Sequence, residues 1–535
     1  MSPFEPVHTT GVPSPNTFDR RSFLNRAGSA ALLLGSTSLL SARSGTSPRT
    51  PAALGAARPK VGGTLRAGLT GGGSADTLNP FRAVTNTDFA RVNNLFDPLV
   101  RYNTNAEPEL WLAEEISPNK DFTRWIVRVR PGIFFHNGKP LTAEDIIYTL
   151  RTAATPGANS SSLVQGLDVT GLRQIDRLTA EVPFKAPFAS FVGVLLDYWF
   201  NVVPAGYDFK TSRPVVGTGP FVLRSFVPGQ ESVFVRNESY WRHGHPYVDS
   251  LVISDFPDES SQTNAIESGN VDVVNGLSAP SIAVLESAGE KVAIDDGGSF
   301  STFVMNTEVA PFNDVRVRQA LRLLVNRKQM RDIVFQGHGV LGNDVFSIFD
   351  PVYDHALPQR EQNVSHARSL LRQAGHANLS VELVIANVGP GIMSMATVLA
   401  QQATAAGVTI TLREVTPSAL YGPNYTKWPF AVNYWYNSNY FPQVLETTLP
   451  TASQPETRFN NRDYTRLFYQ AQKAPVHERT LIAHKMQLID FEEGGYIIPF
   501  FLPVISGLGK QIYGDPSSKV GIDFNNWDFQ NMWKG

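Results

Sequence analysis

The spacing of apolar side chains predicts a chain in which strands and helices alternate. Near residues 123–130, Trp125, Val127 and Val129 alternate with more polar neighbours, which is the period of a half-buried strand. Residues 142–145 then read Thr-Ala-Glu-Asp, a pattern typical of a helix start with a capping box. The new helix carries its apolar side chains on one face: Ile146, Ile147 and Leu150.

Three more helices are predicted in the second half of the chain. Asn313 or Asp314 can cap a helix at 313–325, whose apolar stripe follows helical spacing. A second helix runs from about Asn326 to Phe335. We expect Ser365 to cap a third helix, which ends at Gly375 and has the apolar residues Ala367, Leu370, Leu371 and Ala374.

Residues 380–414 form the clearest supersecondary pattern. An alternating run at 381–385 precedes a helical run from Ile392 to Ala403, and a second alternating run follows at 408–412. This order predicts a βαβ unit with two parallel strands. A further strand, 430–435, leads into the polar and aromatic segment 436–442. Because ligands of open parallel sheets lie beyond the carboxyl ends of the strands, this segment is a candidate site.

Length and composition narrow the class of protein. A chain of 535 residues is too long for one ordinary core, and 42% apolar with 18% charged residues is normal for a globular protein. The formal charge of −2 offers no basic excess for nucleic acid. The absence of cysteine excludes disulfides, thiolate nucleophiles and Cys-ligated metal clusters. We expect no cofactor and no nucleic-acid partner.

The first sixty residues are interpreted as an export signal and a flexible leader. Arg20-Arg21-Ser22-Phe23-Leu24 resembles the twin-arginine motif, and a modest apolar stretch, 27–42, follows it. Cleavage is expected between Ala42 and Ala57. No later segment has eighteen consecutive apolar residues, so we expect an exported, soluble mature chain on the periplasmic or outer side of a bacterial membrane.

Motifs of catalysis and metal binding are weak. Residues 337–342 fit G-x-G-x-x-G but follow a helix, whereas a dinucleotide loop follows a strand. Ser117 and Lys120 have the S-x-x-K spacing of a class of serine enzymes, yet Pro-Asn lies between them and predicts a turn. His243 and His245 lack nearby ligands. We therefore expect no catalytic and no metal-binding residues, and an exported serine hydrolase remains the alternative.

Aromatic residues gather around the strand at 430–435. Part of this density belongs to the core, because strand alternation lets only half of the side chains face one way. Trp435, Tyr436 and Tyr440 nevertheless flank the polar Ser438 and Asn439. Aromatic faces together with amide and hydroxyl groups are suited to a polar organic ligand.

Several blocks of the chain, in the same order, resemble extracellular solute-binding proteins of the peptide/nickel-binding family 5, which serve ABC importers. The resemblance runs from about residue 61 to the end of the chain. The blocks are Gly62-Gly63-Thr64-Leu65-Arg66, Asn94-Leu95-Phe96-Asp97-Pro98-Leu99-Val100, the run from Arg130-Pro131-Gly132 to Leu141-Thr142-Ala143-Glu144-Asp145, Val216-Gly217-Thr218-Gly219-Pro220-Phe221, and Val317-Arg318-Gln319-Ala320.

The resemblance implies an α/β protein with the two-lobed periplasmic-binding-protein-like fold (class II, with an extra subdomain) and a hinged cleft. Its expected division is a leader at 1–60, lobe I at 61–305 with a subdomain at about 81–200, lobe II at 306–505, and a return to lobe I at 506–535. A monomer would capture a small-molecule or peptide ligand and deliver it to an ABC permease. The expected ligand-binding residues are Trp435, Asn439, Tyr436, Tyr440, Ser438, Gly72, Gly73 and Ser74.

One departure from the family bears on the ligand. Peptide-binding members have an Asp shortly after the Trp of this strand, where it pairs with the amino terminus of the peptide. Here Ser438 or Asn439 stands at that position. An ammonium that lacks this partner loses a hydrogen bond of about 1.5–3 kcal/mol. The sequence therefore favours a neutral or capped peptide, an amino-sugar or oligosaccharide, or another polar metabolite over a peptide with a free amino group.

Overall fold

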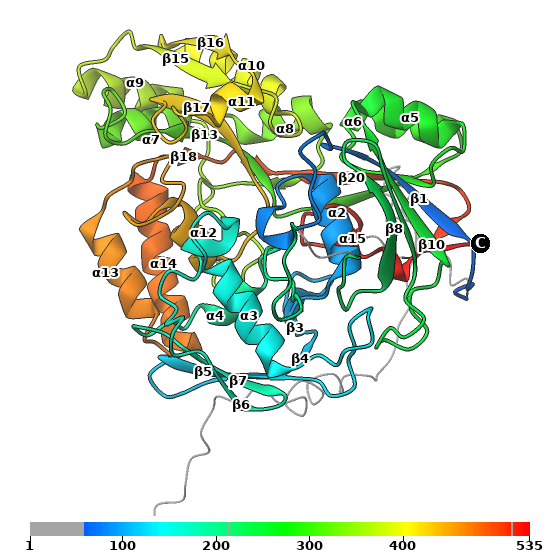
Figure 1. The fold of residues 1–535 in the computed structure, drawn as a ribbon. Coiled ribbons are helices and arrows are strands. Elements are labelled where there is room, and N and C mark those ends of the chain that lie inside the picture. The colour runs from blue at the N-terminus through cyan, green and yellow to red at the C-terminus, as the bar shows by residue number, and fades with distance from the viewer. Residues whose placement is uncertain (1–57, 211–213, 515–516) are drawn as a thin grey trace, which may run out of the picture.

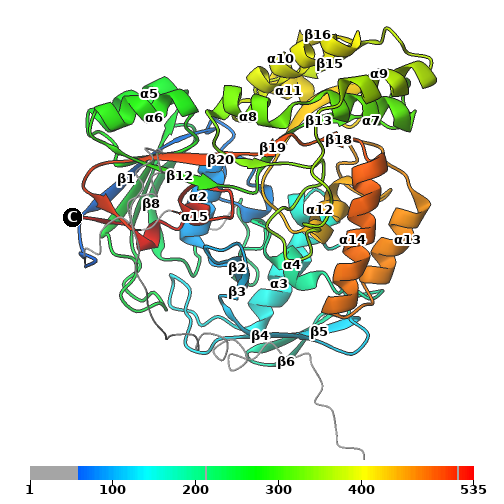
Figure 2. The same ribbon diagram turned by 180° about the vertical axis from the view of Figure 1, so that it is seen from behind.

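The computed structural model describes residues 58–210, 214–514 and 517–535. The chain folds into two lobes and a subdomain, each built on its own sheet (Figures 1 and 2). The expected export signal and most of the leader lie outside the described residues. Within them, no helix combines the length and apolar character that a membrane span requires.

Lobe I is built on a seven-stranded mixed sheet in the order β12-β20-β11-β1-β10-β9-β8. The central strand β1 runs parallel to β10 and β11, and its alternate residues Leu65, Ala67 and Leu69 are fully buried. The strands are β1 (Thr64–Thr70), β8 (Phe221–Val227), β9 (Glu231–Arg236), β10 (Ser250–Phe256), β11 (Val273–Val274), β12 (Lys291–Asp296) and β20 (Pro503–Leu508). Its helices are α2 (Asn86–Leu95), α5 (Glu259–Glu267), α6 (Ala279–Ser287) and α15 (Asp523–Trp527).

The subdomain lies below lobe I in Figure 1 and has a four-stranded antiparallel sheet, β4-β5-β7-β6. The strand predicted near 123–130 is β5, and the capping box predicted at Thr142 is present at the start of α3. Its elements are β2 (Val100–Tyr102), β3 (Pro108–Leu110), β4 (Ala113–Pro118), β5 (Arg124–Val129), α3 (Ala143–Ala153), β6 (Arg173–Asp176), β7 (Thr179–Pro183) and α4 (Phe191–Leu195).

Lobe II has a five-stranded sheet in the order β16-β15-β17-β13-β18. The predicted βαβ unit is confirmed, because β15 and β16 are parallel and α10 (Ile392–Ala403) connects them. The strands are β13 (Phe300–Met305), β15 (Ser380–Ile385), β16 (Thr409–Glu414), β17 (Phe430–Trp435) and β18 (Tyr496–Ile497). The other helices are α7 (Val315–Leu324), α8 (Arg327–Phe335), α9 (Val364–Gln373), α11 (Pro417–Leu420), α12 (Tyr440–Thr447), α13 (Arg462–Ala471) and α14 (Val476–Glu493).

The predicted helix starts in lobe II are right at α7 and wrong at α9. The side chain of Asp314 caps α7 by accepting a hydrogen bond from the Arg316 amide. At α9 the cap is Asn363, whose side chain accepts from the His366 amide, and Ser365 donates its hydroxyl to Asn363 instead. Asn and Ser are both good N-caps, and the sequence has one of each, Asn363 and Ser365, two positions apart.

Residues 337–342 form a close contact between backbones and not a nucleotide loop. The short strands β14 (Val340–Leu341) and β19 (Phe500–Phe501) pair here. A Cβ atom at Gly342 would lie 2.3 Å from the carbonyl oxygen of Ile498, and one at Gly339 would lie 2.5 Å from that of Phe501. The close approach of the backbones therefore explains why Gly339 and Gly342 carry no side chain.

The chain passes between the lobes at two neighbouring points. Gly297 donates its amide hydrogen to the Leu502 carbonyl at 3.2 Å, and the Leu502 amide donates to the Ser299 carbonyl at 2.8 Å. The first crossing precedes β13, which pairs with β17 and β18 in the lobe II sheet. Residues 300–305, expected in lobe I, therefore belong to lobe II, and residues 503–505, expected in lobe II, begin β20 of lobe I. The paired crossings form the hinge segment.

Candidate functional site

The loop 436–439 lies where the two lobes meet. It follows the carboxyl end of β17 and leads into α12, which packs against α4 of the subdomain. A Cβ atom at Gly298, in the hinge segment, would lie 2.2 Å from Oδ1 of Asn437. The loop is therefore in contact with the hinge on one side and faces lobe I and its subdomain on the other. This is the location that the sequence predicted for a site.

Two hydrogen bonds connect this loop to the other lobe. The Tyr436 hydroxyl donates to Oδ1 of Asn86, the first residue of α2, at 2.7 Å. The Tyr102 hydroxyl, at the end of β2, donates to Oδ1 of Asn439 at 2.8 Å. Ser438 keeps its hydroxyl within the loop, 3.5 Å from the Asn439 carbonyl oxygen. Tyr436 and Asn439, both expected to bind ligand, thus lie at the interface between the lobes.

Aromatic rings from both lobes pack around Tyr436. Its ring lies 5.9 Å from Phe89 of α2, 5.6 Å from Tyr198, and 5.1 Å from Tyr434 of β17. All three pairs are edge-to-face, the arrangement in which a positive ring edge meets a negative ring face. Each such pair contributes about 0.5–1.5 kcal/mol beyond the burial of its area. We call these four residues the aromatic cluster.

Trp435 supports the loop from within lobe II. Its side chain is 8% exposed, and its indole N–H donates to Oε1 of Glu456 at 2.8 Å. Glu456 also accepts from the Tyr496 hydroxyl at 2.8 Å, and its side chain is buried. Burial raises the pKa of Glu456 to about 7, although these hydrogen bonds oppose the shift. Trp435 thereby anchors the end of β17 in the core.

Tyr440 holds the other end of the loop. Its side chain is fully buried, and its hydroxyl donates to Oδ2 of Asp490 at 2.7 Å while lying 3.0 Å from the Tyr464 hydroxyl. Its amide donates to Oδ2 of Asp350 at 2.7 Å. In this arrangement Tyr440 fixes the start of α12 and presents no surface at the interface.

Gly72, Gly73 and Ser74 form a separate loop after β1. A Cβ atom at Gly72 would lie 2.5 Å from the carboxyl carbon of Asp255, and the Gly73 amide donates to Oδ1 of Asp76 at 2.8 Å. Arg91 of α2 is fully buried and forms ion pairs with both carboxylates at 2.5 Å. This loop neighbours the interface, because the Cβ position of Gly71 lies 3.8 Å from the Asn86 amide nitrogen.

Sequence reasoning missed the residues of the opposite lobe. Asn86, Phe89, Tyr102 and Tyr198 are separated from Tyr436 and Asn439 by more than 230 positions, and no local motif marks them. The N-terminal position of Asn86 on α2 was readable as a helix start, but its partner was not. Contacts at such sequence separation follow only from the packing of the lobes.

The structure gives the Ser117 motif no catalytic geometry. Ser117 lies on β4, its hydroxyl donates to Glu115 at 2.7 Å, and the strand ends at Pro118. A hydrogen-bonded turn follows, in which the Phe122 amide donates to the Asn119 carbonyl. Ser117 and Lys120 therefore do not stand one helical turn apart, as a serine enzyme of this type requires. Among the described residues, no three His, Asp or Glu side chains are grouped to hold a metal ion.

Comparison with known proteins points to one family. The model of "Bacterial extracellular solute-binding proteins, family 5 Middle" matches residues 107–454. The chain is 25% identical over 310 residues to the nickel-binding periplasmic protein of Escherichia coli K12, covering 56% of this chain and 59% of that protein. It is 26% identical over 336 residues to the dipeptide-binding protein of Pseudomonas aeruginosa PAO1, covering 57% and 63%. The matches thus span about 60% of these relatives' length.

Solved structures share the fold over more of the chain. The periplasmic binding protein DppA of Helicobacter pylori, in complex with the peptide STSA, has a TM-score of 0.75 at 18% identity and covers 89% of this chain and 98% of its own. NikZ of Campylobacter jejuni, in complex with Ni(L-His), has a TM-score of 0.76 at 15% identity, with 88% and 99% covered. These likenesses show that the two-lobed fold is that of periplasmic binding proteins.

The family model covers more than half of the chain, and the overall fold agrees with the solved structures. The chain therefore belongs to the bacterial extracellular solute-binding proteins of family 5.

Proposed function

We propose that the protein is the substrate-binding component of an ABC importer, which captures a peptide or another polar organic solute outside the membrane and delivers it unaltered to the permease. One observation carries this proposal: Tyr436 and Asn439 of lobe II form hydrogen bonds with Asn86 and Tyr102 across the lobe interface. These contacts, beside two hydrogen-bonded crossings, are those of a closed hinged body.

The proposed mechanism is a change of population between open and closed lobes. A solute that contacts both lobes binds the closed arrangement more tightly than the open one, and it shifts the equilibrium by that difference in affinity. The permease then distinguishes the closed form. Tyr436, Asn439 and Ser438 are proposed to contact the solute, with Gly72, Gly73 and Ser74 as the lobe I loop nearby. Trp435 and Tyr440 position the loop 436–439.

Localisation and assembly belong to the same proposal. Arg20 and Arg21 direct export in a folded state, the mature chain acts on the outer side of the membrane, and it works as a monomer. Replacing both arginines by lysine is expected to leave the protein in the cytoplasm. Light scattering of the mature chain is expected to give the mass of one copy.

A thermal-shift screen of the mature chain tests the function. The library contains di- to pentapeptides, oligosaccharides and metal chelates. A solute at one hundred times its Kd stabilises the folded form by about 2.7 kcal/mol, so a true ligand raises the Tm. Calorimetry then compares the chain with Tyr436→Ala, Asn439→Ala and the control Tyr469→Ala, whose ring is half exposed on α13. Unchanged affinity in the first two variants would contradict the site.

The same sample separates transport from hydrolysis. Mass spectrometry of the bound solute is expected to return it with no change in mass, and Ser117→Ala is expected to bind as the unmodified chain does. Release of a cleaved product, lost in Ser117→Ala, would instead establish the serine hydrolase.

A further inference from the structure

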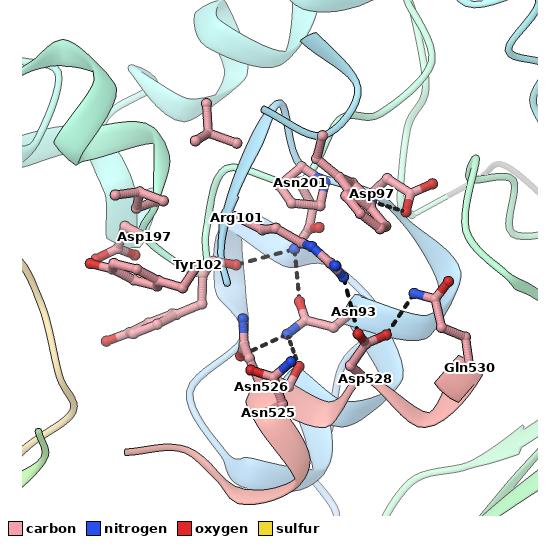
Figure 3. Close-up of a pocket in the computed structure, with 15 residues that line it drawn as sticks. Asn93, Asp97, Arg101, Tyr102, Asp197, Asn201, Asn525, Asn526, Asp528 and Gln530 are labelled. Carbon is pink, nitrogen blue, oxygen red and sulfur yellow. Dashed lines mark hydrogen bonds and ion pairs between the residues drawn. The ribbon is translucent and has the colours of Figure 1, made fainter. Parts of the chain in front are cut away.

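A small cavity lies beside the lobe interface, between α2, β2, the segment after α4 and the turn of α15 (Figure 3). It encloses about 50 Å³, which is room for one end group of a solute and not for a whole oligopeptide. Tyr102, Asp197 and Asn201 are among the residues that line it. Tyr102 also carries the hydrogen bond to Asn439, so the cavity adjoins the proposed solute site.

The donor groups of Arg101 and Asn201 in the cavity wall are already in use. Arg101 forms ion pairs with Glu109 and Asp528, both at 3.0 Å, and its guanidinium stacks 3.3 Å from the centre of the Trp111 ring. The amide nitrogen of Asn201 donates to Oδ1 of Asn93 at 3.1 Å and to the Tyr198 carbonyl at 3.3 Å. Figure 3 shows the Arg101–Asp528 ion pair and the bond from Asn201 to Asn93 along the wall. An incoming group finds no free cation here among the residues that line the cavity.

Two acceptor oxygens of the wall lack partners. Oδ1 of Asn201 and Oδ1 of Asn525 are buried without a hydrogen bond, and Asn201 as a whole is 2% exposed. The orientation of the Asn201 amide is fixed, because its nitrogen donates to two oxygens. Asn525 belongs to a run of four consecutive left-handed residues, Phe524 to Trp527. The wall therefore presents oxygens that require a donor.

A buried carboxylate lines the cavity, and a second belongs to the neighbouring helix of lobe II. Asp197, after α4, lines the cavity together with Tyr198. Glu446 lies outside the lining, on α12 of lobe II, which packs against α4. Glu446 is 2% exposed and its Oε1 has no partner, while Asp197 accepts one side-chain bond, from the Trp199 amide at 3.3 Å.

The surroundings of this pair contain little compensating charge. Burial raises the pKa of Asp197, and burial followed by the charge of Asp197 raises the pKa of Glu446. No cation of the described chain lowers either pKa. The nearby Asp350 is satisfied by the amides of Tyr440 and Val352, and Arg479 donates to the Ala189 carbonyl at 2.7 Å.

We propose that this cavity is a subsite for a primary ammonium group of the solute, held by Asp197, with Glu446 as the second carboxylate and Asn201 as a neutral acceptor. An ammonium has three donors and no acceptor, which matches a wall of unpartnered oxygens. Asp197 supplies the negative charge that one ammonium neutralises, and the nearby charge of Glu446 adds to the negative potential. The inference rests on the proposed function and specifies its substrate class.

The inference revises the expectation drawn from the sequence. The lack of an acid after Trp435 argued against a peptide with a free amino group. In the structure, an acid is available from Asp197, which lines the cavity 238 positions before Trp435 in the chain. An amine would thus be held at this subsite and not at the end of β17.

Matched pairs of amines and their N-acetyl forms test the subsite. Calorimetry at pH 7.5 compares di- and tripeptides, hexosamines and 1,4-diaminobutane with the acetylated form of each. We expect the free amine to bind at least tenfold more tightly than its partner. Asp197→Asn and Glu446→Gln are each expected to remove this preference, and Asp463→Asn, an exposed acid on α13, to keep it.

Each outcome decides between the proposals. If acetylated or neutral solutes bind and amines gain nothing, the ammonium subsite is wrong and the transport function stands. If no solute of any class binds, the transport function itself is contradicted. Should the variants not fold, the unmodified chain still decides, because amine affinity is expected to rise at least fivefold from pH 5 to pH 7.5 while that of acetylated solutes stays constant.

Discussion

The two tyrosine hydroxyls that bridge the lobes allow a quantitative test of closure. Tyr436→Phe and Tyr102→Phe keep the rings and remove only the bonds to Asn86 and Asn439. Both bonds exist only when the lobes are together, and each contributes about 1 kcal/mol net. One replacement should therefore lower the closed-to-open ratio about fivefold, and the double replacement about thirtyfold. A ratio of about 30:1 would become about 1:1.

The measurement uses the absence of cysteine from the sequence. Cysteines introduced at Glu267 on α5 and His366 on α9, both exposed, take a fluorophore pair without competing thiols. Single-molecule energy transfer then reports the distribution between the lobes. We expect a second, low-transfer population to grow from the single to the double variant, while Tyr469→Phe leaves it unchanged. An unaltered distribution in the double variant would refute the reasoning that these hydroxyls hold the lobes closed.

Three further predictions concern stability. Because the pKa of Glu456 is raised to about 7, its contribution to the free energy of unfolding is present below about pH 4.5 and is lost as the pH rises through about 7. This pH-dependent contribution is about 3 kcal/mol. Glu456→Gln should therefore flatten the fall in Tm between pH 5 and pH 8. Arg91→Met leaves Asp76 and Asp255 buried and unpaired, and chemical denaturation should show a loss of about 3–5 kcal/mol. Gly72→Ala forces a Cβ against Asp255 and should cost about 1–3 kcal/mol in the same assay, whereas Gly73→Ala, with open space at its Cβ, should cost less.

The sequence predicted elements whose information is local. Apolar periodicity alone predicts the parallel pair β15 and β16 and the strand β17. Periodicity together with a capping residue predicts helices α3 and α7. Each of these signals lies within about thirty residues. The α9 cap failed because Asn363 and Ser365 both suit that role, and side-chain geometry decided between them. The sequence also predicted where the loop 436–439 lies, because the loop directly follows the end of β17.

The remainder of the site depends on packing between distant segments. Alternation could not reveal that Trp435 turns inward to Glu456, because both directions are available to a residue at the end of a strand. Nor could it reveal that Tyr440, at the start of α12, bonds to Asp490. Nor could composition show that Asp197 and Glu446 are both buried. Solvated acids and desolvated acids look the same in a sequence, and only the surrounding chain distinguishes them.

The neighbouring crossings at Gly297–Ser299 and Leu502 have a consequence for the ancestry and engineering of this architecture. The chain leaves lobe I before residue 300 and returns to it after residue 502, at adjacent positions. The flanking strands β12 and β20 pair antiparallel over six residue pairs. Lobe II, residues 300–502, is thus topologically an insertion in the connection between β12 and β20 of lobe I. Because the two ends of this insertion lie side by side, another domain could replace it without changing the strand order of the lobe I sheet. The recognition surface of lobe II could thus be exchanged while lobe I keeps its fold.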